Sequence, residues 1–308
     1  MRKRSRVHLP QPTERLSIGT GGCRVSPFCL GITSSPEVVL HAYETGINFF
    51  FLSGDLHWPL YAQTRRGISR LLREKLCKRD DIVVGVVSYL ENPWFSGLQF
   101  QEVIDSTPGL ERVDLLVAGG VSGDGSCSRF STLLQARASS HLGSTCIGAS
   151  FHSRRHALQA DHLQILDIAY VRYNTGHPSA ECDLFPHLSQ DSANLLYNFK
   201  SMNFRVTSEQ LQSKNLAGKV WVPDAADYYR FALSEPSLDG ILCSPSSIRE
   251  VDELTAAMTR GPLSAEIRDY LVWLSSIVYS ISPDTRQENE VGEAIVSKQN
   301  DLLRAARL

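Results

Sequence analysis

Residues 82–89 read IVVGVVSY and residues 113–120 read VDLLVAGG, two nearly uninterrupted apolar runs. A strand with one face in water alternates apolar and polar residues, whereas a run that is apolar throughout is typical of a strand buried on both faces. Such strands occur in parallel sheets that are covered by helices. The two runs therefore predict an α/β fold with a parallel sheet.

Six further short apolar runs raise the number of expected strands to eight, and segments with helical spacing lie between them. The expected strands are 28–32, 46–52, 82–89, 114–119, 145–149, 167–172, 193–199 and 239–243, and the expected helices include 36–45, 60–76, 223–234, 246–258 and 264–282. Eight strands that alternate with helices over about 250 residues predict a (β/α)8 TIM barrel. A doubly wound sheet is the alternative, but no GxGxxG motif follows the first strand.

Both ends of the sequence add elements to this barrel. GTGG at 19–22 lies between two short apolar pieces and predicts a β-hairpin over 15–26. The barrel is expected over 28–258 and a helical tail over 264–308. Because no linker or internal repeat divides the sequence, we expect residues 1–308 to form a single domain.

The composition excludes several classes of protein. The 308 residues include 31 Lys and Arg against 33 Asp and Glu, and 42% of the residues are hydrophobic. A disordered chain is poorer in apolar residues, and a balanced charge creates no field that attracts nucleic acid. No apolar run approaches the ~20 residues of a membrane helix, and none follows the basic start as a signal peptide would. We expect a cytoplasmic protein that binds a small molecule rather than nucleic acid or a membrane.

The cysteine and histidine patterns do not indicate a metal centre or a disulfide framework. The seven cysteines are scattered and contain no CxxC pair, which predicts free thiols. Asp55, His57, His177 and Glu181 are residue types that bind zinc or iron, but no HxxxH or HExxH spacing joins them. We therefore expect no metal site.

Five segments occur in an order that is characteristic of one enzyme superfamily. They are HAYETGINFF at 41–50, GLERVDLLVAGG at 109–120, IGAS at 147–150, VRYNTGHPSAECDLFPHL at 171–188 and YYRFALSEPSLDGILCSPSSIREVDEL at 228–254. With these segments the chain resembles a divergent bacterial branch of the aldo-keto reductase superfamily. The resemblance implies a (β/α)8 barrel and, in the superfamily at large, hydride transfer from NAD(P)H to a carbonyl group.

The resemblance also implies that the superfamily's catalytic groups are missing. These groups are a Tyr acid supported by Asp and Lys, and a His that orients the substrate. The corresponding positions here carry Phe51 for Asp, Leu56 for Tyr, Val87 or Ser88 for Lys, and Gly119 for His. Loss of the acid removes general acid catalysis worth about two to four orders of magnitude. We expect that the standard reductase mechanism does not operate.

The resemblance implies an altered site for NADP(H). A Ser-Asn pair that holds the nicotinamide in the superfamily reads Ser150-Phe151 here. The segment after the last strand carries candidate phosphate ligands at a helix N-terminus, and an arginine there can pair with phosphate. These residues are Ser244, Ser246, Ser247 and Arg249. The alternative is that the serines cap the helix.

Polar residues that follow the strands are the candidates for catalysis, because barrel enzymes carry their catalytic groups on these loops. SGDLHWPLY at 53–61 supplies an acid, a base and a phenol in Asp55, His57 and Tyr61. Tyr89 follows the third strand among aromatic residues that suggest an apolar substrate wall. His152 follows the fifth strand, where a solvated helix start is the simpler interpretation.

The loop after the sixth strand supplies Arg172, Asn174 and His177. Arg172 is suited to bind a carboxylate or phosphate and shares one side of an extended segment with Asn174. His177 faces Glu181 only in a helix, which the Pro178 that follows it disfavours. The alternative is that these residues form buried hydrogen bonds at the barrel rim.

Three functions remain open on this sequence. The first is an enzyme that acts on a small organic substrate by proton transfer, in a cyclisation, elimination, isomerisation or hydrolysis. The second is an NADP(H)-dependent oxidoreductase in which Tyr61 or His57 replaces the lost acid. The third is a non-catalytic binding protein on the same scaffold.

Overall fold

The computed structural model describes residues 7–19, 22–55, 57–90, 92–122, 126–138, 142–144, 146–189, 192 and 194–281. The strands in these ranges are β1 (Leu16–Ile18), β2 (Cys23–Val25), β3 (Phe28–Leu30), β4 (Phe49–Ser53), β5 (Val83–Ser88), β6 (Leu115–Val121), β7 (Cys146–Phe151), β8 (Ile168–Arg172), β9 (Leu195–Phe199) and β10 (Gly240–Cys243). The α-helices are α1 (Pro36–Glu44), α2 (Ala62–Arg73), α3 (Pro93–Asp105), α4 (Ser126–Ala138), α5 (Arg154–Leu163), α6 (Ala180–Asp183), α7 (Ser208–Ser213), α8 (Ala225–Leu233), α9 (Ile248–Met258) and α10 (Ala265–Tyr279).

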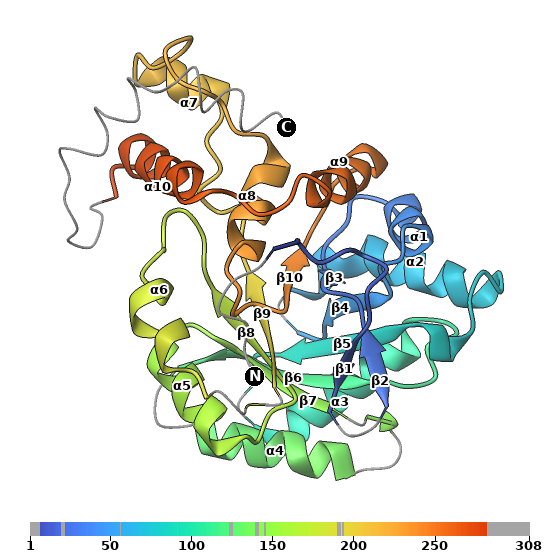
Figure 1. Ribbon diagram of the computed structural model, residues 1–308. Helices are drawn as coiled ribbons and strands as arrows, with labels where there is room; N and C mark the ends of the chain where they lie inside the picture. The colour runs from blue at the N-terminus through green and yellow to red at the C-terminus, as the bar shows by residue number, and fades with distance from the viewer. Residues whose placement is uncertain are drawn as a thin grey trace.

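The strands from β3 to β10 close into a parallel barrel in sequence order, with β10 paired to β3. Every residue of β5 is buried, as the unbroken apolar run predicts, because the barrel interior covers one face and the helices cover the other (Figure 1). The predicted (β/α)8 barrel is confirmed. The predicted hairpin is confirmed as well, since β1 and β2 pair in antiparallel fashion.

Strand β6 was expected to end at Gly119 and continues to Val121. Its pairing with β7 shifts register between Ala118 and Val121. Gly120 has a φ of 63°, a left-handed conformation that glycine adopts without a steric penalty. The apolar pattern stops at the two glycines, but the pairing resumes after this irregularity.

The expected helices are found as α1, α2, α8, α9 and α10, each shorter than expected by one or more residues. Helices α3, α4, α6 and α7 were not predicted, and for α5 only a helix start after the fifth strand was expected. Ser-Cys-Ser at the start of α4 and Gly97 within α3 have low intrinsic helix propensity. These segments are helical in a tertiary context, since α3 packs against β5 and α4 packs against β6 and β7.

Aromatic side chains fill the interior of the barrel. The ring centroids of Phe51 and Tyr170 are 5.3 Å apart, those of Tyr170 and Tyr197 are 5.8 Å apart, and those of Phe49 and Tyr197 are 5.7 Å apart. All four side chains are buried. Burial raises the pKa of Tyr170 and of Tyr197 well above the ordinary value, so both phenols stay protonated at neutral pH.

The hairpin lies across the amino ends of the barrel strands. The carbonyl oxygen of Ile18 accepts a hydrogen bond from the Cys146 thiol at 3.6 Å, at the start of β7. The Asn48 amide, just before β4, donates to the carbonyl oxygen of Arg24 at 2.9 Å. The hairpin therefore covers the end of the barrel opposite to the loops that carry the candidate catalytic residues.

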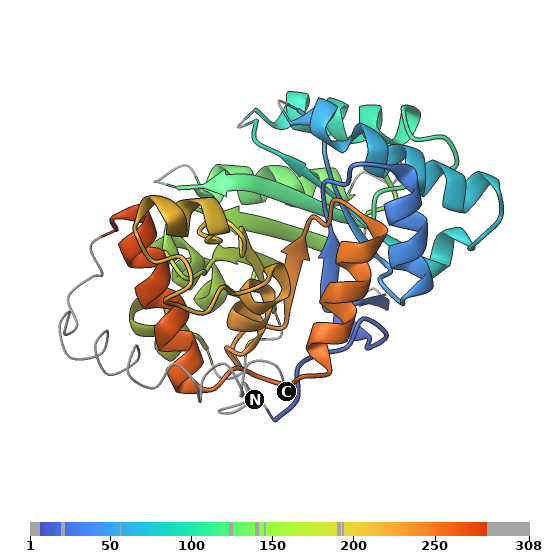
Figure 2. The same cartoon turned by 90° about the horizontal axis from the view of Figure 1, so that it is seen from above.

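Helix α10 lies beside α7 and above the loops that follow β8 and β9 (Figures 1 and 2). The Ser275 hydroxyl donates to Thr175 Oγ1 at 2.7 Å, and the Tyr279 hydroxyl donates to the carbonyl oxygen of Arg205 at 2.6 Å. This confirms a C-terminal helical extension as far as α10, whereas residues 282–308 of the expected tail lie outside the described residues. Within the described ranges, no helix is long and apolar enough to cross a membrane.

Candidate functional site

Asp55 joins the loops that follow β4 and β5. Its carboxylate accepts hydrogen bonds from the Ser53 hydroxyl at 3.0 Å and from the backbone N–H of Tyr89. Both oxygens therefore have a partner within the protein, and each loop is fixed relative to the other. In this arrangement Asp55 acts as an anchor for the residues around it.

His57 and Tyr89 lie next to each other as a result of this anchor. Their ring centroids are 5.0 Å apart. His57 is exposed, and the Tyr89 side chain is 37% exposed. Burial raises the pKa of Tyr89, and the Asp55 charge adds to this effect, so at neutral pH the phenol is a hydrogen-bond donor.

Two glycines of β6 make room for the Tyr89 ring. A Cβ atom at Gly119 would lie 2.6 Å from two carbons of this ring, closer than real Cβ atoms come. A Cβ atom at Gly120 would lie 3.4 Å from the Tyr89 ring and 3.3 Å from the His152 ring. The two rings therefore flank Gly120, with no β6 side chain between them.

The η1 turn (Trp58–Tyr61) after His57 is held by α2. The Arg65 guanidinium lies 3.5 Å from the centroid of the Trp58 ring and donates to the Trp58 carbonyl oxygen at 2.8 Å. Tyr61, an expected catalytic acid, is only 8% exposed. Burial raises its pKa far above the ordinary value, and Tyr89 and Asp55 contribute further, so Tyr61 is a poor proton donor at neutral pH.

His152 and Arg172, at the carboxyl ends of β7 and β8, are hydrogen-bonded to each other. Nη2 of Arg172 lies 3.3 Å from Nδ1 of His152. Burial, followed by the charges of Arg172 and Lys200, lowers the pKa of His152 below 6.5. Lys200 follows β9 directly, so three neighbouring strands deliver one basic cluster, which we define as His152, Arg172 and Lys200.

Asn174 lies in the loop after β8 as a buried, hydrogen-bonded residue. Its side chain is fully buried, its amide donates to the Lys200 carbonyl oxygen at 2.9 Å, and its oxygen accepts from the Gly176 N–H at 3.1 Å. Lys200 has a φ of 62°, unusual for a residue with a side chain. Asn174 is thus placed to hold the backbone that carries Lys200, and its catalytic role stays a prediction.

His177 and Glu181 do not face each other. His177 packs edge-on against the Phe204 ring at 5.1 Å, whereas the Glu181 carboxylate accepts hydrogen bonds from the Tyr173 hydroxyl and from Arg268 of α10, where the Arg268 contact is 2.5 Å long. Burial, followed by the charges of Arg172 and Arg154, lowers the pKa of His177. His177 therefore packs against Phe204, and Glu181 is part of the attachment of α10.

The start of α9 is capped by residues of the chain itself. Ser247 Oγ accepts the Glu250 N–H at 3.2 Å, and the Glu250 carboxylate accepts the Ser246 N–H at 2.7 Å. The exposed Arg249 donates to Glu253 at 2.7 Å. Ser244 lies exposed just before this turn. Ser150, on β7, accepts the Gly120 N–H at 2.8 Å and thereby ties β7 to the β6 irregularity.

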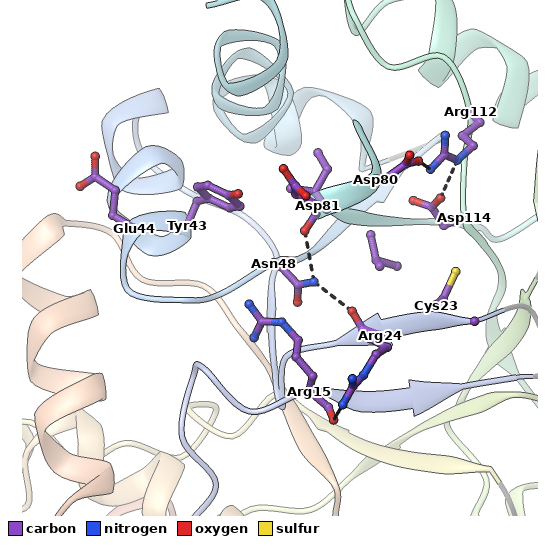
Figure 3. A pocket seen from close by; sticks show the side chains of 13 residues that line it. Arg15, Cys23, Arg24, Tyr43, Glu44, Asn48, Asp80, Asp81, Arg112 and Asp114 are labelled. Atoms are coloured by element: carbon purple, nitrogen blue, oxygen red, sulfur yellow. Dashed lines mark hydrogen bonds and ion pairs between the residues drawn. The ribbon is translucent and has the colours of Figure 1, made fainter. Parts of the chain in front are cut away.

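A cavity of about 750 Å³ lies at the opposite, amino end of the barrel, between the hairpin and the starts of β4, β5 and β6 (Figure 3). Two of its acidic residues are neutralised by arginines. Asp114 is bound to Arg79 at 2.7 Å and to Arg112 at 3.1 Å, and Asp80 is bound to Arg112 at 2.6 Å. In barrel enzymes this end contributes to stability rather than to chemistry, and these pairs fit that role. Among the described residues no group of three metal-binding side chains could hold an ion.

No family model and no curated protein sequence matches the chain, but solved structures do. The aldo-keto reductase AKR11C1 from Bacillus halodurans, in its holo form, has 15% sequence identity and a TM-score of 0.63, with 91% of this chain and 99% of that chain covered. The thermostable aldo-keto reductase Tm1743, in complex with the inhibitor epalrestat, has 16% identity and a TM-score of 0.62, with 85% and 99% covered.

The chain has the aldo-keto reductase fold. The fold assigned by resemblance is therefore confirmed, although identities this low carry no residue roles. Of the positions where the resemblance expects the catalytic groups, Phe51 and Val87 are buried apolar residues, and Ser88, the alternative to Val87, is buried as well. Gly119 has no side chain, and Leu56 lies outside the described residues. That these positions correspond to the superfamily's catalytic groups stays a prediction.

The aldo-keto reductase fold also raises the question of NADP(H). The expected phosphate ligands are Ser244, Ser246, Ser247 and Arg249. An anion at the start of α9 would meet the Glu250 carboxylate, which already accepts the Ser246 N–H, and Arg249 is directed to Glu253. In this arrangement the residues present do not fit a nucleotide phosphate, and we derive no reaction step from the cofactor.

Proposed function

We propose that the chain is a cytoplasmic enzyme that acts on a small organic molecule at the carboxyl end of the barrel by proton transfer. The reaction would be a cyclisation, elimination, isomerisation or hydrolysis. The observation that carries this proposal is the hydrogen bond from the Tyr89 N–H to the Asp55 carboxylate. It places an imidazole and a phenol side by side, with ring centroids 5.0 Å apart, where barrel enzymes perform their chemistry.

The two rings have different roles in this proposal. The exposed His57 transfers the proton, because an imidazole nitrogen can accept a proton from a substrate and return it. The protonated Tyr89 phenol donates a hydrogen bond to the negative charge that develops on the substrate. Asp55 is a positioning residue, because its two oxygens are occupied by Ser53 and the Tyr89 amide.

The proposal is tested by incubating the purified protein with a pool of small organic acids in D₂O and following conversion and deuterium uptake by mass spectrometry. His57→Gln and Tyr89→Phe should each lower turnover by about two to four orders of magnitude. Tyr43→Phe, at the amino end of the barrel, is the matched control and should retain full turnover. Unchanged turnover in both test variants, or no conversion by the wild type, would overturn the proposal.

A cofactor measurement separates this proposal from an oxidoreductase. Titration with NADPH, followed by tryptophan fluorescence, should show no micromolar binding, because Glu250 occupies the N-terminus of α9. Micromolar binding would overturn the cofactor-independent mechanism and favour an NADP(H)-dependent enzyme.

A further inference from the structure

We propose that the basic cluster of His152, Arg172 and Lys200 binds an oxyanion group of the substrate, a carboxylate or a phosphate. This inference rests on the proposed function and names its substrate class. The three residues follow or end neighbouring strands, and the pairing of Phe151 with Val171 and of Arg172 with Phe199 places them in adjacent positions along the barrel rim.

The hydrogen bond within the cluster determines which groups it offers to a ligand. A guanidinium group has no acceptor, so Nδ1 of His152 must accept from Arg172. A neutral imidazole that accepts at Nδ1 carries its proton on Nε2. His152, Arg172 and Lys200 therefore present only hydrogen-bond donors, and the matching ligand group must be an acceptor.

The charge of the cluster is not balanced by the protein. Among the described residues, neither Arg172 nor Lys200 forms an ion pair with a carboxylate, in contrast to Arg79, Arg112, Arg154 and Arg268. Burial lowers the pKa of His152, and the positive charges of Arg172 and Lys200 lower it further. A planar guanidinium beside an ammonium group favours an oxyanion, because bidentate and charge-assisted hydrogen bonds form to carboxylate and phosphate oxygens.

The cluster is placed to orient a substrate relative to the acid–base pair. Nε2 of His152 would be 3.5 Å from a Cβ atom at Gly120, and the Tyr89 ring would be 3.4 Å from that same atom. A small molecule whose oxyanion is bound at His152 therefore extends past the glycines toward Tyr89 and His57. The negative Asp55 lies beyond Tyr89, which disfavours the reverse orientation of the anion.

The test uses sulfate, whose charge does not change near neutral pH, and measures the melting temperature of the full chain at constant ionic strength set by chloride. Wild-type protein should show a saturable rise, because a ligand of the native state stabilises it. Arg172→Met and Lys200→Met should each weaken sulfate binding by about tenfold or more, and Arg172→Lys should weaken it less. Arg66→Met, in an exposed residue of α2 that contacts Gln63, is the matched control and should bind sulfate normally.

The outcomes separate this inference from the proposed function. Sulfate binding needs no turnover, so saturable binding that depends on Arg172 and Lys200 supports the inference even if His57→Gln leaves turnover unchanged. The absence of saturable binding in the wild type, or equal affinity in Lys200→Met and the wild type, overturns it. Inorganic phosphate and malonate, used in parallel, distinguish a phosphorylated substrate from a carboxylic acid.

Discussion

Nη2 of Arg172 lies 3.3 Å from Nδ1 of His152, and this contact links the end of β8 to the first residue after β7. The two residues are twenty positions apart in the sequence, and no sequence motif links them. The pairing of β7 with β8 brings them together, and it converts two separate polar residues into a cluster that also includes Lys200 of the next strand. This basic cluster and the Asp55-anchored rings flank the two glycines of β6.

The first prediction concerns pH. Because burial and the charges of Arg172 and Lys200 lower the pKa of His152 below 6.5, the unfolded chain binds a proton at this residue more readily than the folded chain. The free energy of unfolding should fall as the pH drops below about 6.5, and this contribution should level off below the folded-state pKa. His152→Gln should reduce the slope of melting temperature against pH between 5 and 7.

An NMR titration of the histidine ring protons provides a direct check of the cause. Arg172→Met should raise the His152 pKa, since it removes a positive charge that contacts the ring, and Arg66→Met should leave it unchanged. An unchanged His152 titration in Arg172→Met would contradict the electrostatic account.

The second prediction concerns the space that Gly119 provides. Gly119→Ala would place a Cβ atom 2.6 Å from the Tyr89 ring, so the ring or the strand must shift, with a loss of stability of about 1–3 kcal/mol. Gly97→Ala, where a Cβ atom would meet nothing within 4 Å, is the control and should not destabilise the helix. Chemical denaturation measures the stability of both variants. Equal stability of the wild type and Gly119→Ala would show that the Tyr89 ring does not pack against this glycine.

The third prediction concerns the amino end of the barrel. The Asp114 side chain is 5% exposed, is bound to Arg79 at 2.7 Å and accepts the Val84 N–H at 2.7 Å. Asp114→Ala leaves the buried Arg79 guanidinium without a carboxylate partner and should cost about 3–5 kcal/mol of stability. Asp80→Ala removes an exposed carboxylate and should cost much less. Urea denaturation measures both variants, and a comparable loss of stability in the two would show that the burial of Asp114 does not determine the cost.

The fourth prediction concerns Asn174 as a positioning residue. Asn174→Ala leaves the buried Gly176 N–H without a partner, at a cost of about 1–3 kcal/mol for a buried group. It also removes one of the two hydrogen bonds to the Lys200 carbonyl oxygen, which still accepts the Asn203 N–H at 3.2 Å. Because the Lys200 backbone then loses a restraint, sulfate binding should weaken as well. Asn203→Ala, in an exposed residue of the same loop, should change neither property. Normal sulfate affinity in Asn174→Ala would limit Asn174 to a role in stability.

Much of the fold was determined by the sequence itself. The runs IVVGVVSY and VDLLVAGG are apolar at nearly every position, because strands of a closed barrel are buried on both faces, and this property can be read without knowledge of the partners. The positions of Asp55 and His57 shortly after one strand and of Arg172 at the end of another likewise follow from strand order, since all parallel strands end at one side of a barrel.

The contacts between these loops were decided only by the tertiary structure. From the sequence, Tyr89 was assigned to an apolar substrate wall and His152 to a helix start. Their partners Asp55 and Arg172 lie 34 and 20 residues away in the sequence, so these contacts could not be predicted. Tyr61 and Asn174 are candidates for catalysis in the sequence, and only the structure shows that both are buried. Hydrogen bonding and desolvation depend on which strands lie side by side and in which register. A local sequence pattern reveals neither the neighbouring strand nor the register.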